Sequence, residues 1–254
     1  MNKIIVNADD FGLTESCSNA IVEAFKENLI SSTTAIANGK YIEQAYQLAR
    51  DNDFSDKIGI HINLTEGVPL TERIKKDSFF CENGMFHDRI NRLQKPDKNQ
   101  IENLKNEVTA QIERLLNLGF TLTHADSHHH IHTDIFFEDT IKDVLFSYGI
   151  KKIRIHRNFG KIKFYKRVGK SLYNIKLHRQ GFITTEKMGS FEDLQNSPKT
   201  VSDNLCEIMV HPDFDKLGRL IDRTDYKNDM PIGQDLSDIR KYTNGINLMS
   251  YKEL

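Results

Sequence analysis

Apolar and polar positions along the chain follow two alternating periods. Continuous apolar runs, or apolar residues at every second position, predict strands at 3–6, 32–37, 58–63, 121–125, 153–155, 182–185, 206–210 and 246–249. Apolar residues at helical spacing predict helices at 16–28, 41–50 and 101–115, and Gly119 is placed to end the last one. The alternation of strand and helix predicts a parallel sheet. Eight such strands favour an irregular, TIM-like (β/α) barrel over an open doubly wound sheet, with the active site at the strand C-termini.

We expect one domain over residues 1–254, with two segments that depart from the pattern. Residues 67–97 contain Pro69, Gly84 and Pro96 and predict a long loop excursion at one rim of the barrel. Residues 151–185 carry eleven Lys or Arg and no Asp or Glu. This basic segment is either a solvated insertion or a binding surface for an anionic glycan, a carrier-linked sugar or a membrane. No recognised nucleic-acid-binding motif accompanies it, so nucleic acid is not expected as a partner.

Composition indicates where the protein is expected in the cell, but it does not indicate a reaction. The 35 Lys and Arg residues nearly balance the 36 Asp and Glu residues, so the overall charge indicates no partner. Three widely spaced cysteines are typical of a reducing compartment. The first residues show no signal-peptide pattern, and no apolar run reaches the roughly 18 residues of a membrane span. We therefore expect a cytoplasmic protein without a transmembrane segment.

Carboxylates and histidines follow or lie on several predicted strands. Asp9 and Asp10 come directly after the first strand, and His61 alternates with isoleucines on the third. Five of the ten histidines fall between His124 and His132, and His211 follows another strand. In a barrel the carboxyl ends of all strands converge on one face. These polar groups are therefore predicted to meet there.

A carboxylate with two imidazoles, and no nearby cysteine, is a donor set for zinc, manganese, nickel or magnesium. One aspartate of the opening pair would bind the ion and the other would act as a general base. Each group also has a structural interpretation. The aspartates could form a turn before Gly12, His61 could be a hydrogen-bonded strand residue, and the histidine tract could be a surface feature.

The chain resembles the YdjC-like carbohydrate deacetylases, which include chitooligosaccharide and hopanoid-associated members. The resemblance spans nearly the whole chain, in the order of the family's motifs. It is carried by the stretches Asn7–Gly12, Ser32–Thr34, Gly59–His61, Thr123–His132, Val210–Pro212 and Ser250–Tyr251. The Asp-Asp-Phe-Gly start combined with the Asp-Ser-His-His-His tract is the specific part.

The resemblance implies a divalent-metal hydrolase that removes acetyl groups from N-acetylated sugars or oligosaccharides. By motif position, the metal ligands are Asp10, His61 and His128, with Mg²⁺ or Zn²⁺ as the expected ion. Asp9 corresponds to the catalytic base and His211 to a general acid. Arg154 lies roughly where an arginine orients the base. The family also suggests a homodimer.

Two other functions remain open from the sequence. A different metal-dependent hydrolase on the same barrel, such as a phosphoesterase, would fit the basic segment. A non-catalytic metal-binding protein would need the ligands alone, so the retained Asp9 argues against it. His129, His130 and His132 are predicted to be supporting or solvated residues, because three protein ligands suffice for a catalytic metal.

Overall fold

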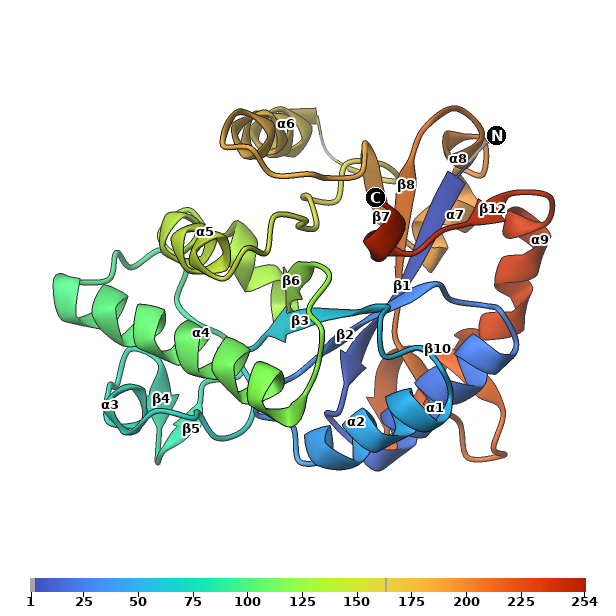
Figure 1. Ribbon diagram of the computed structural model, residues 1–254. Helices are drawn as coiled ribbons and strands as arrows, with labels where there is room; N and C mark the ends of the chain where they lie inside the picture. Colours follow the sequence, from blue (N-terminus) through green and yellow to red (C-terminus); the bar gives the residue numbers. More distant parts are fainter. Residues whose placement is uncertain (1–2, 163) are drawn as a thin grey trace.

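A parallel sheet curls into an incomplete barrel at the centre of the molecule (Figure 1). The computed structural model describes residues 3–162 and 164–254. Within them the strand order is β6-β3-β2-β1-β8-β7, with β12 beside the start of β1, and every pairing is parallel. The strands are β1 (Lys3–Phe11), β2 (Ser32–Ala35), β3 (Ile58–Ile62), β6 (Ala125–Ser127), β7 (Lys187–Ser190), β8 (Cys206–Val210) and β12 (Asn247–Leu248). The predicted irregular (β/α) barrel is confirmed.

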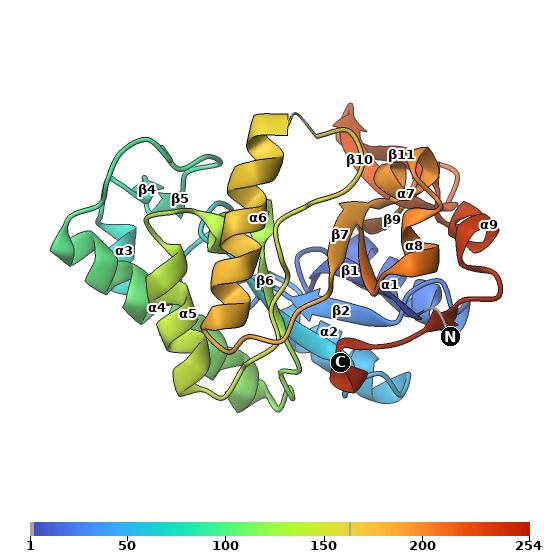
Figure 2. The same cartoon turned by 90° about the horizontal axis from the view of Figure 1, so that it is seen from above.

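Helices flank the sheet in groups. The longer ones are α1 (Glu15–Lys26), α2 (Ile42–Asp51), α4 (Lys98–Leu118), α5 (Glu138–Ser147) and α6 (Phe164–Arg179). The short ones are α3 (Glu72–Lys75), α7 (Phe191–Asn196), α8 (Thr200–Asp203) and α9 (Arg240–Thr243), with 3-10 turns η1 (His128–Thr133), η2 (Leu236–Ile239) and η3 (Tyr251–Glu253). Figure 2 shows α4, α5 and α6 on the β6 side of the sheet and α7, α8 and α9 on the β7 and β8 side.

Local sequence explains the elements that were predicted well. On β3 the isoleucines enter the main apolar core, and the alternating His61 points away from it toward Asp10. Asp97 and Gln100 form a capping box at the start of α4. Gly119, at φ 101°, ends that helix as predicted, in a conformation that glycine adopts without strain.

Three predicted strands are wrong or displaced. Residues 121–125 contribute only their last residue to β6, although the backbone of Thr123 already donates to Ile58. Residues 153–155 and 182–185 form no strand and make only isolated parallel bridges, Ala125 with Ile153 and Lys152 with Ile183. After its bridge, the backbone of the first segment turns away and His156 bonds to the Asn174 side chain. A single bridge cannot extend into a ladder once the chain leaves the sheet.

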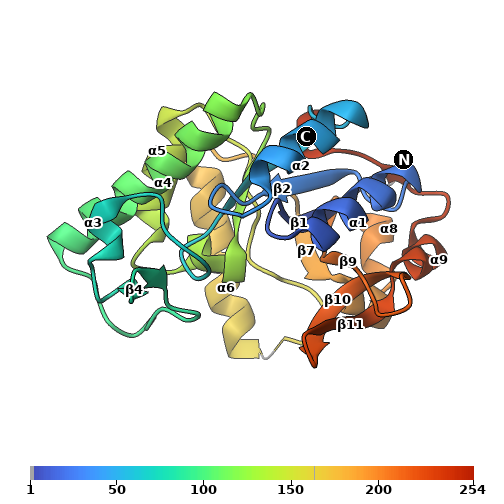
Figure 3. The same cartoon turned by 90° about the horizontal axis from the view of Figure 1, so that it is seen from below.

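Several elements were not predicted. β7 has little apolar alternation, and its place at the edge of the sheet follows from pairing with β8. An antiparallel sheet of β9 (Pro212–Phe214), β10 (Leu220–Lys227) and β11 (Met230–Asp235) extends from the C-terminal end of β8. Figure 3 shows it beside α1, on the opposite side of the molecule from the hairpin of β4 (Cys81–Glu82) and β5 (Met85–Phe86).

Both segments that depart from the strand–helix pattern contain regular structure. Residues 67–97 contain α3 and the β4–β5 hairpin, and the described part of residues 151–185 contains α6. Lys163, within the basic segment, lies outside the described residues. None of the helices described is both long and apolar enough to cross a lipid bilayer.

Candidate active site

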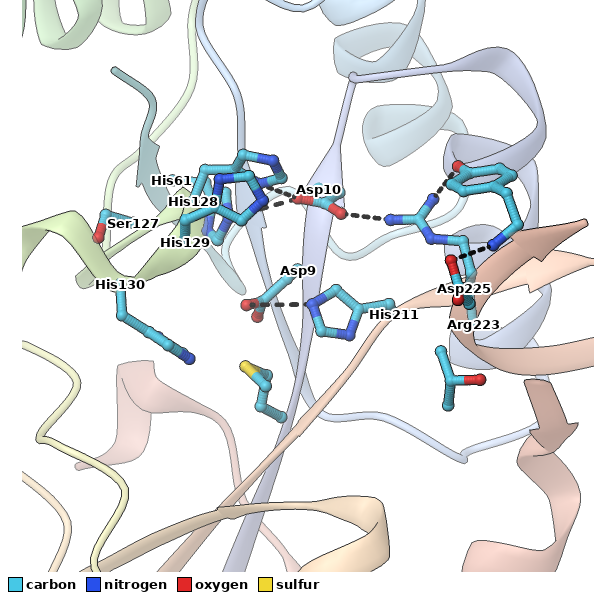
Figure 4. Close-up of a pocket in the computed structure, with 13 residues that line it drawn as sticks. Asp9, Asp10, His61, Ser127, His128, His129, His130, His211, Arg223 and Asp225 are labelled. Carbon is cyan, nitrogen blue, oxygen red and sulfur yellow. Dashed lines mark hydrogen bonds and ion pairs between the residues drawn. The ribbon is translucent and has the colours of Figure 1, made fainter. Parts of the chain in front are cut away.

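Asp9 and Asp10 end β1 and both line one cavity (Figure 4). In a regular strand, adjacent side chains point to opposite faces. Here the pairing of β1 with β2 shifts register between Ala8 and Phe11, and Asp10 has a φ of 72°. An irregularity of this kind redirects side chains and is common next to active sites. It brings two neighbouring carboxylates into the same cavity.

Asp10 lies between two imidazoles that come from other strand ends. Its Oδ1 atom is 2.9 Å from Nδ1 of His128 and 3.3 Å from Nε2 of His61. All three side chains are buried, and their donor atoms lie within 4.8 Å of one another. One carboxylate and two imidazole nitrogens are the donors of an open catalytic metal site, so these residues fit a divalent ion.

Each imidazole of this triad also contacts a second carboxylate. Nδ1 of His61 is 2.6 Å from Asp126, and Nε2 of His128 is 3.0 Å from Glu66. Burial lowers the pKa of His61, but Asp126 and Asp10 outweigh it and raise the value to about 10. Asp10 and Glu66 similarly raise the pKa of His128 to about 9 against the effect of burial. Such outer carboxylates orient metal-binding imidazoles.

A second group of possible ligands, Asp9, His61 and Asp126, lies beside the triad. The buried guanidinium of Arg154 contacts both oxygens of Asp9, at 2.6 and 2.7 Å, and Asp126 at 2.7 Å. A cation bound there would share these oxygens with a fixed positive charge. Asp10, His61 and His128 are therefore the favoured ligand set.

Arg154 organises the carboxylates below the cavity. Its Nε atom donates to Glu207 at 2.7 Å, and the Tyr251 hydroxyl donates to the other oxygen of Glu207. Burial alone would raise the pKa of Asp9, but the charge and hydrogen bonds of Arg154 outweigh it and hold the pKa well below its usual range. Asp9 is thus kept ionised.

His211 faces Asp9 from the end of β8. Its Nε2 atom lies 4.0 Å from Oδ2 of Asp9, and its side chain is partly exposed to the cavity. The structure therefore brings together all five residues singled out from the sequence. Asp9, Asp10, His61, His128 and His211 all line the cavity, whose volume is about 360 Å³.

The other histidines of the tract have different surroundings. His129 and His130 line the cavity and adopt left-handed backbone conformations, with φ of 51° and 54°. His132 is buried, and its backbone N–H donates to the Ser127 hydroxyl at 2.9 Å. His124 is also buried, stacks on Tyr251 and contacts Asn7. None of these residues belongs to the favoured triad.

Three residues in contact with the triad or its supports were missed by sequence reasoning. Arg223 on β10 donates to Oδ2 of Asp10 at 2.7 Å and to Asp213 at 3.1 Å. Glu66 and Glu207 contact His128 and Arg154. Glu66 lies four residues after the end of β3, and Glu207 is a single acid within an apolar strand. An ionisable residue inside an apolar strand was the available signal for Glu207.

At least four of the eleven basic residues in the basic segment have partners within the protein. Arg154 is buried among carboxylates, Arg157 pairs with Asp193, and Lys176 lies 2.7 Å from Glu138. Lys152 donates to the backbone carbonyls of Tyr251 and Lys252. An excess of basic residues in this segment therefore does not amount to an equally basic surface.

Comparison with known proteins identifies the family. Residues 3–241 match the profile of the family described as YdjC-like protein. The chain belongs to the YdjC-like family. A "Carbohydrate deacetylase" of Vibrio cholerae is 34% identical over 215 residues, covering 84% of this chain and 79% of the relative. "Carbohydrate deacetylase 1" of Listeria innocua is 36% identical over 135 residues, covering 53% of this chain and 54% of the relative.

Solved structures show the same fold. A protein of Enterococcus faecalis described as a cellobiose-phosphate cleavage protein superposes with a TM-score of 0.73 at 23% identity, covering 99% of this chain and 98% of that one. The lactam utilization protein of Thermus thermophilus superposes with a TM-score of 0.55 at 11% identity, covering 98% and 99%. Membership of the YdjC-like family thus agrees with the motifs at the ends of β1, β3, β6 and β8.

Proposed function

We propose that this chain is a metal-dependent carbohydrate N-deacetylase. The observation that carries the proposal is the position of Asp9. It lies beside the Asp10–His61–His128 triad, is held ionised by Arg154, and faces His211. A protein that only bound metal would need no second carboxylate held in this way. The names of its relatives support an acetylated sugar as substrate.

Asp10, His61 and His128 would hold the ion. When bound, it would supply Lewis acidity, which polarises the acetamide carbonyl and lowers the pKa of water. The two imidazoles favour a zinc-like ion over Mg²⁺, which prefers an all-oxygen environment.

The remaining residues move protons. Asp9 takes a proton from the water as the water oxygen bonds to the carbonyl carbon of the acetamide. His211, in its protonated form, gives a proton to the amide nitrogen as the C–N bond breaks. The products are acetate and an amino sugar. Arg154 keeps Asp9 in place, since two hydrogen bonds fix both of its oxygens.

Release of acetate from a panel of N-acetylated sugars tests the function directly. We expect the purified protein to release acetate, a chelator to abolish the release, and added Zn²⁺ to restore it. Phosphate release from sugar phosphates, measured in parallel, should be absent. Phosphate release without acetate release would favour the phosphoesterase alternative, and neither product would favour a non-catalytic metal-binding protein.

Metal content tests the ligand set. His128→Ala should remove most bound metal, because it removes one of three donors, while circular dichroism shows a retained fold. His130→Ala is the matched control, since it removes an imidazole from the same tract and cavity but leaves the triad intact. Elemental analysis of both proteins checks this. Full occupancy in the His128→Ala protein would show that another residue is the ligand.

A further inference from the structure

The β10–β11 hairpin supplies one wall of the cavity. Arg223, Thr224, Asp225 and Tyr226 are consecutive on β10, and all four line it together with Asp10 and the histidines. Figure 4 shows Arg223 reaching Asp10 from the side of the cavity opposite His61 and His128. None of these hairpin residues is part of the proposed reaction.

A bulge in β10 gives this wall its shape. The pairing with β11 runs from Arg223 opposite Gly233 to Asp225 opposite Ile232, so β10 contains one extra residue. Residues three apart on a regular strand point to opposite faces. Here the bulge places Arg223 and Tyr226 together, and the guanidinium donates to the tyrosine hydroxyl at 2.7 Å.

The bulge is tightly constrained by its partner strand. A Cβ atom at Gly233 would lie 1.9 Å from the Asp222 carbonyl oxygen and 3.0 Å from the Arg223 Cα atom. Only glycine permits this approach of the two backbones. The same local geometry holds Arg223 where it also reaches Asp10 and Asp213.

Tyr226 is therefore an aromatic ring in a fixed position with an accessible surface. The Arg223 guanidinium carbon lies 5.1 Å from the centre of the ring, yet the residue remains 49% exposed. An exposed aromatic residue that is held in place at the wall of a polar cavity is suited to contact the apolar C–H face of a sugar ring. The chain has no tryptophan, so a stacking platform must be a phenylalanine, a tyrosine or a histidine.

We propose that Tyr226, braced by Arg223, is the platform on which a sugar ring stacks, and that it selects pyranose substrates by this contact. The inference rests on the proposed deacetylase function and assigns its substrate-binding wall. Asp225, adjacent and exposed, offers a carboxylate to ring hydroxyls. Tyr226 lines the same cavity as Asp10, His61 and His128, so a sugar ring stacked on it would share that cavity with the triad.

A fluorescence titration tests the platform without relying on turnover. Tyr226→Trp introduces the only tryptophan of the chain. We expect saturable changes in its emission with N-acetylglucosamine and with its β-1,4-linked disaccharide, and none with acetamide, which has the amide but no ring. Tyr148→Trp is the control, because Tyr148 bonds to Glu113 at the surface and does not line the cavity. It should respond to neither sugar.

Kinetics supply a second readout. Tyr226→Ala should raise KM for the disaccharide about tenfold with a much smaller change in kcat, because stacking away from the reacting atoms is uniform binding. Tyr226→Phe keeps the ring and its contact with the Arg223 guanidinium but loses the hydrogen bond to the hydroxyl, so its KM should rise much less than that of Tyr226→Ala. Equal KM values for the Ala and Phe variants, or a silent Tyr226→Trp reporter in a protein whose wild type releases acetate, would overturn the platform. Sugar binding to the reporter without acetate release by wild type would instead refute the deacetylase function and leave the platform supported.

Discussion

Asp9→Asn should retain bound metal and lose at least about a hundredfold in kcat, the usual contribution of a general base. The amide keeps the shape of the side chain and one of the two acceptors for Arg154, while its NH2 group replaces the other. It cannot take a proton from water. Asp10→Asn should instead lose bound metal, because an amide oxygen is a much weaker ligand than a carboxylate. Elemental analysis and acetate release, measured on both variants, separate the two roles.

The comparison is sharp because the two residues are adjacent, equally buried and identical in type. Any general effect of an Asp→Asn change on this strand would appear in both proteins. Equal loss of metal in the two variants, or near-normal turnover in Asp9→Asn, would show that the roles are assigned wrongly.

Arg154→Met should destabilise the protein by about 3–5 kcal/mol, the usual cost of leaving buried charges without their partner. Arg154 is fully buried and contacts Asp9, Asp126 and Glu207. Its loss leaves three buried carboxylates with less compensation. Arg154→Lys keeps the charge but not the planar fork, so we expect a smaller loss of stability together with a large loss of turnover. Urea unfolding and acetate release check both variants.

Arg157→Met is the matched control for Arg154→Met. Arg157 lies three residues away and pairs with Asp193, but its side chain is 40% exposed. Asp193 is buried, but it still accepts hydrogen bonds from Ser190, so the loss of Arg157 should lower the free energy of unfolding less than the loss of Arg154. Similar destabilisation by the two substitutions would show that the buried network around Arg154 does not contribute more to the free energy of unfolding than the Arg157–Asp193 pair.

The sequence was sufficient for the sheet wherever a strand is buried on both faces or clearly alternates. β1, β2, β3 and β8 were predicted within a few residues, because their apolar runs are needed for the core. The meeting of the carboxylates and histidines was predictable for a related reason, whereas the choice of Asp10, His61 and His128 among them came from the family resemblance. Parallel strands end on one face, so polar residues directly after several strands had to be neighbours.

The sequence did not determine pairing that depends on distant segments. Residues 153–155 are as apolar as a short strand, yet they form a single bridge because the following backbone leaves the sheet to meet α6. β7 is the opposite case: its apolar pattern is weak, but it forms a strand because it pairs with β8. Whether a segment forms a strand depends also on the strand it pairs with, and a local sequence pattern describes only one of the two.

The placement of the basic residues between 151 and 185 also depended on the tertiary structure. A count of basic residues between 151 and 185 left a solvated insertion and a binding surface open, whereas Arg154 from that segment is buried and bonded to Asp9. From the sequence alone came the residue types, the order of strands and helices, and the predicted meeting of Asp9, Asp10, His61, His128 and His211 at one face. The tertiary structure decided which oxygen faces which nitrogen, that a bulge turns Asp9 and Asp10 the same way, and that Arg223 and Tyr226 form a wall. Those outcomes depend on backbone irregularities and on contacts between residues up to 213 positions apart, which no local pattern encodes.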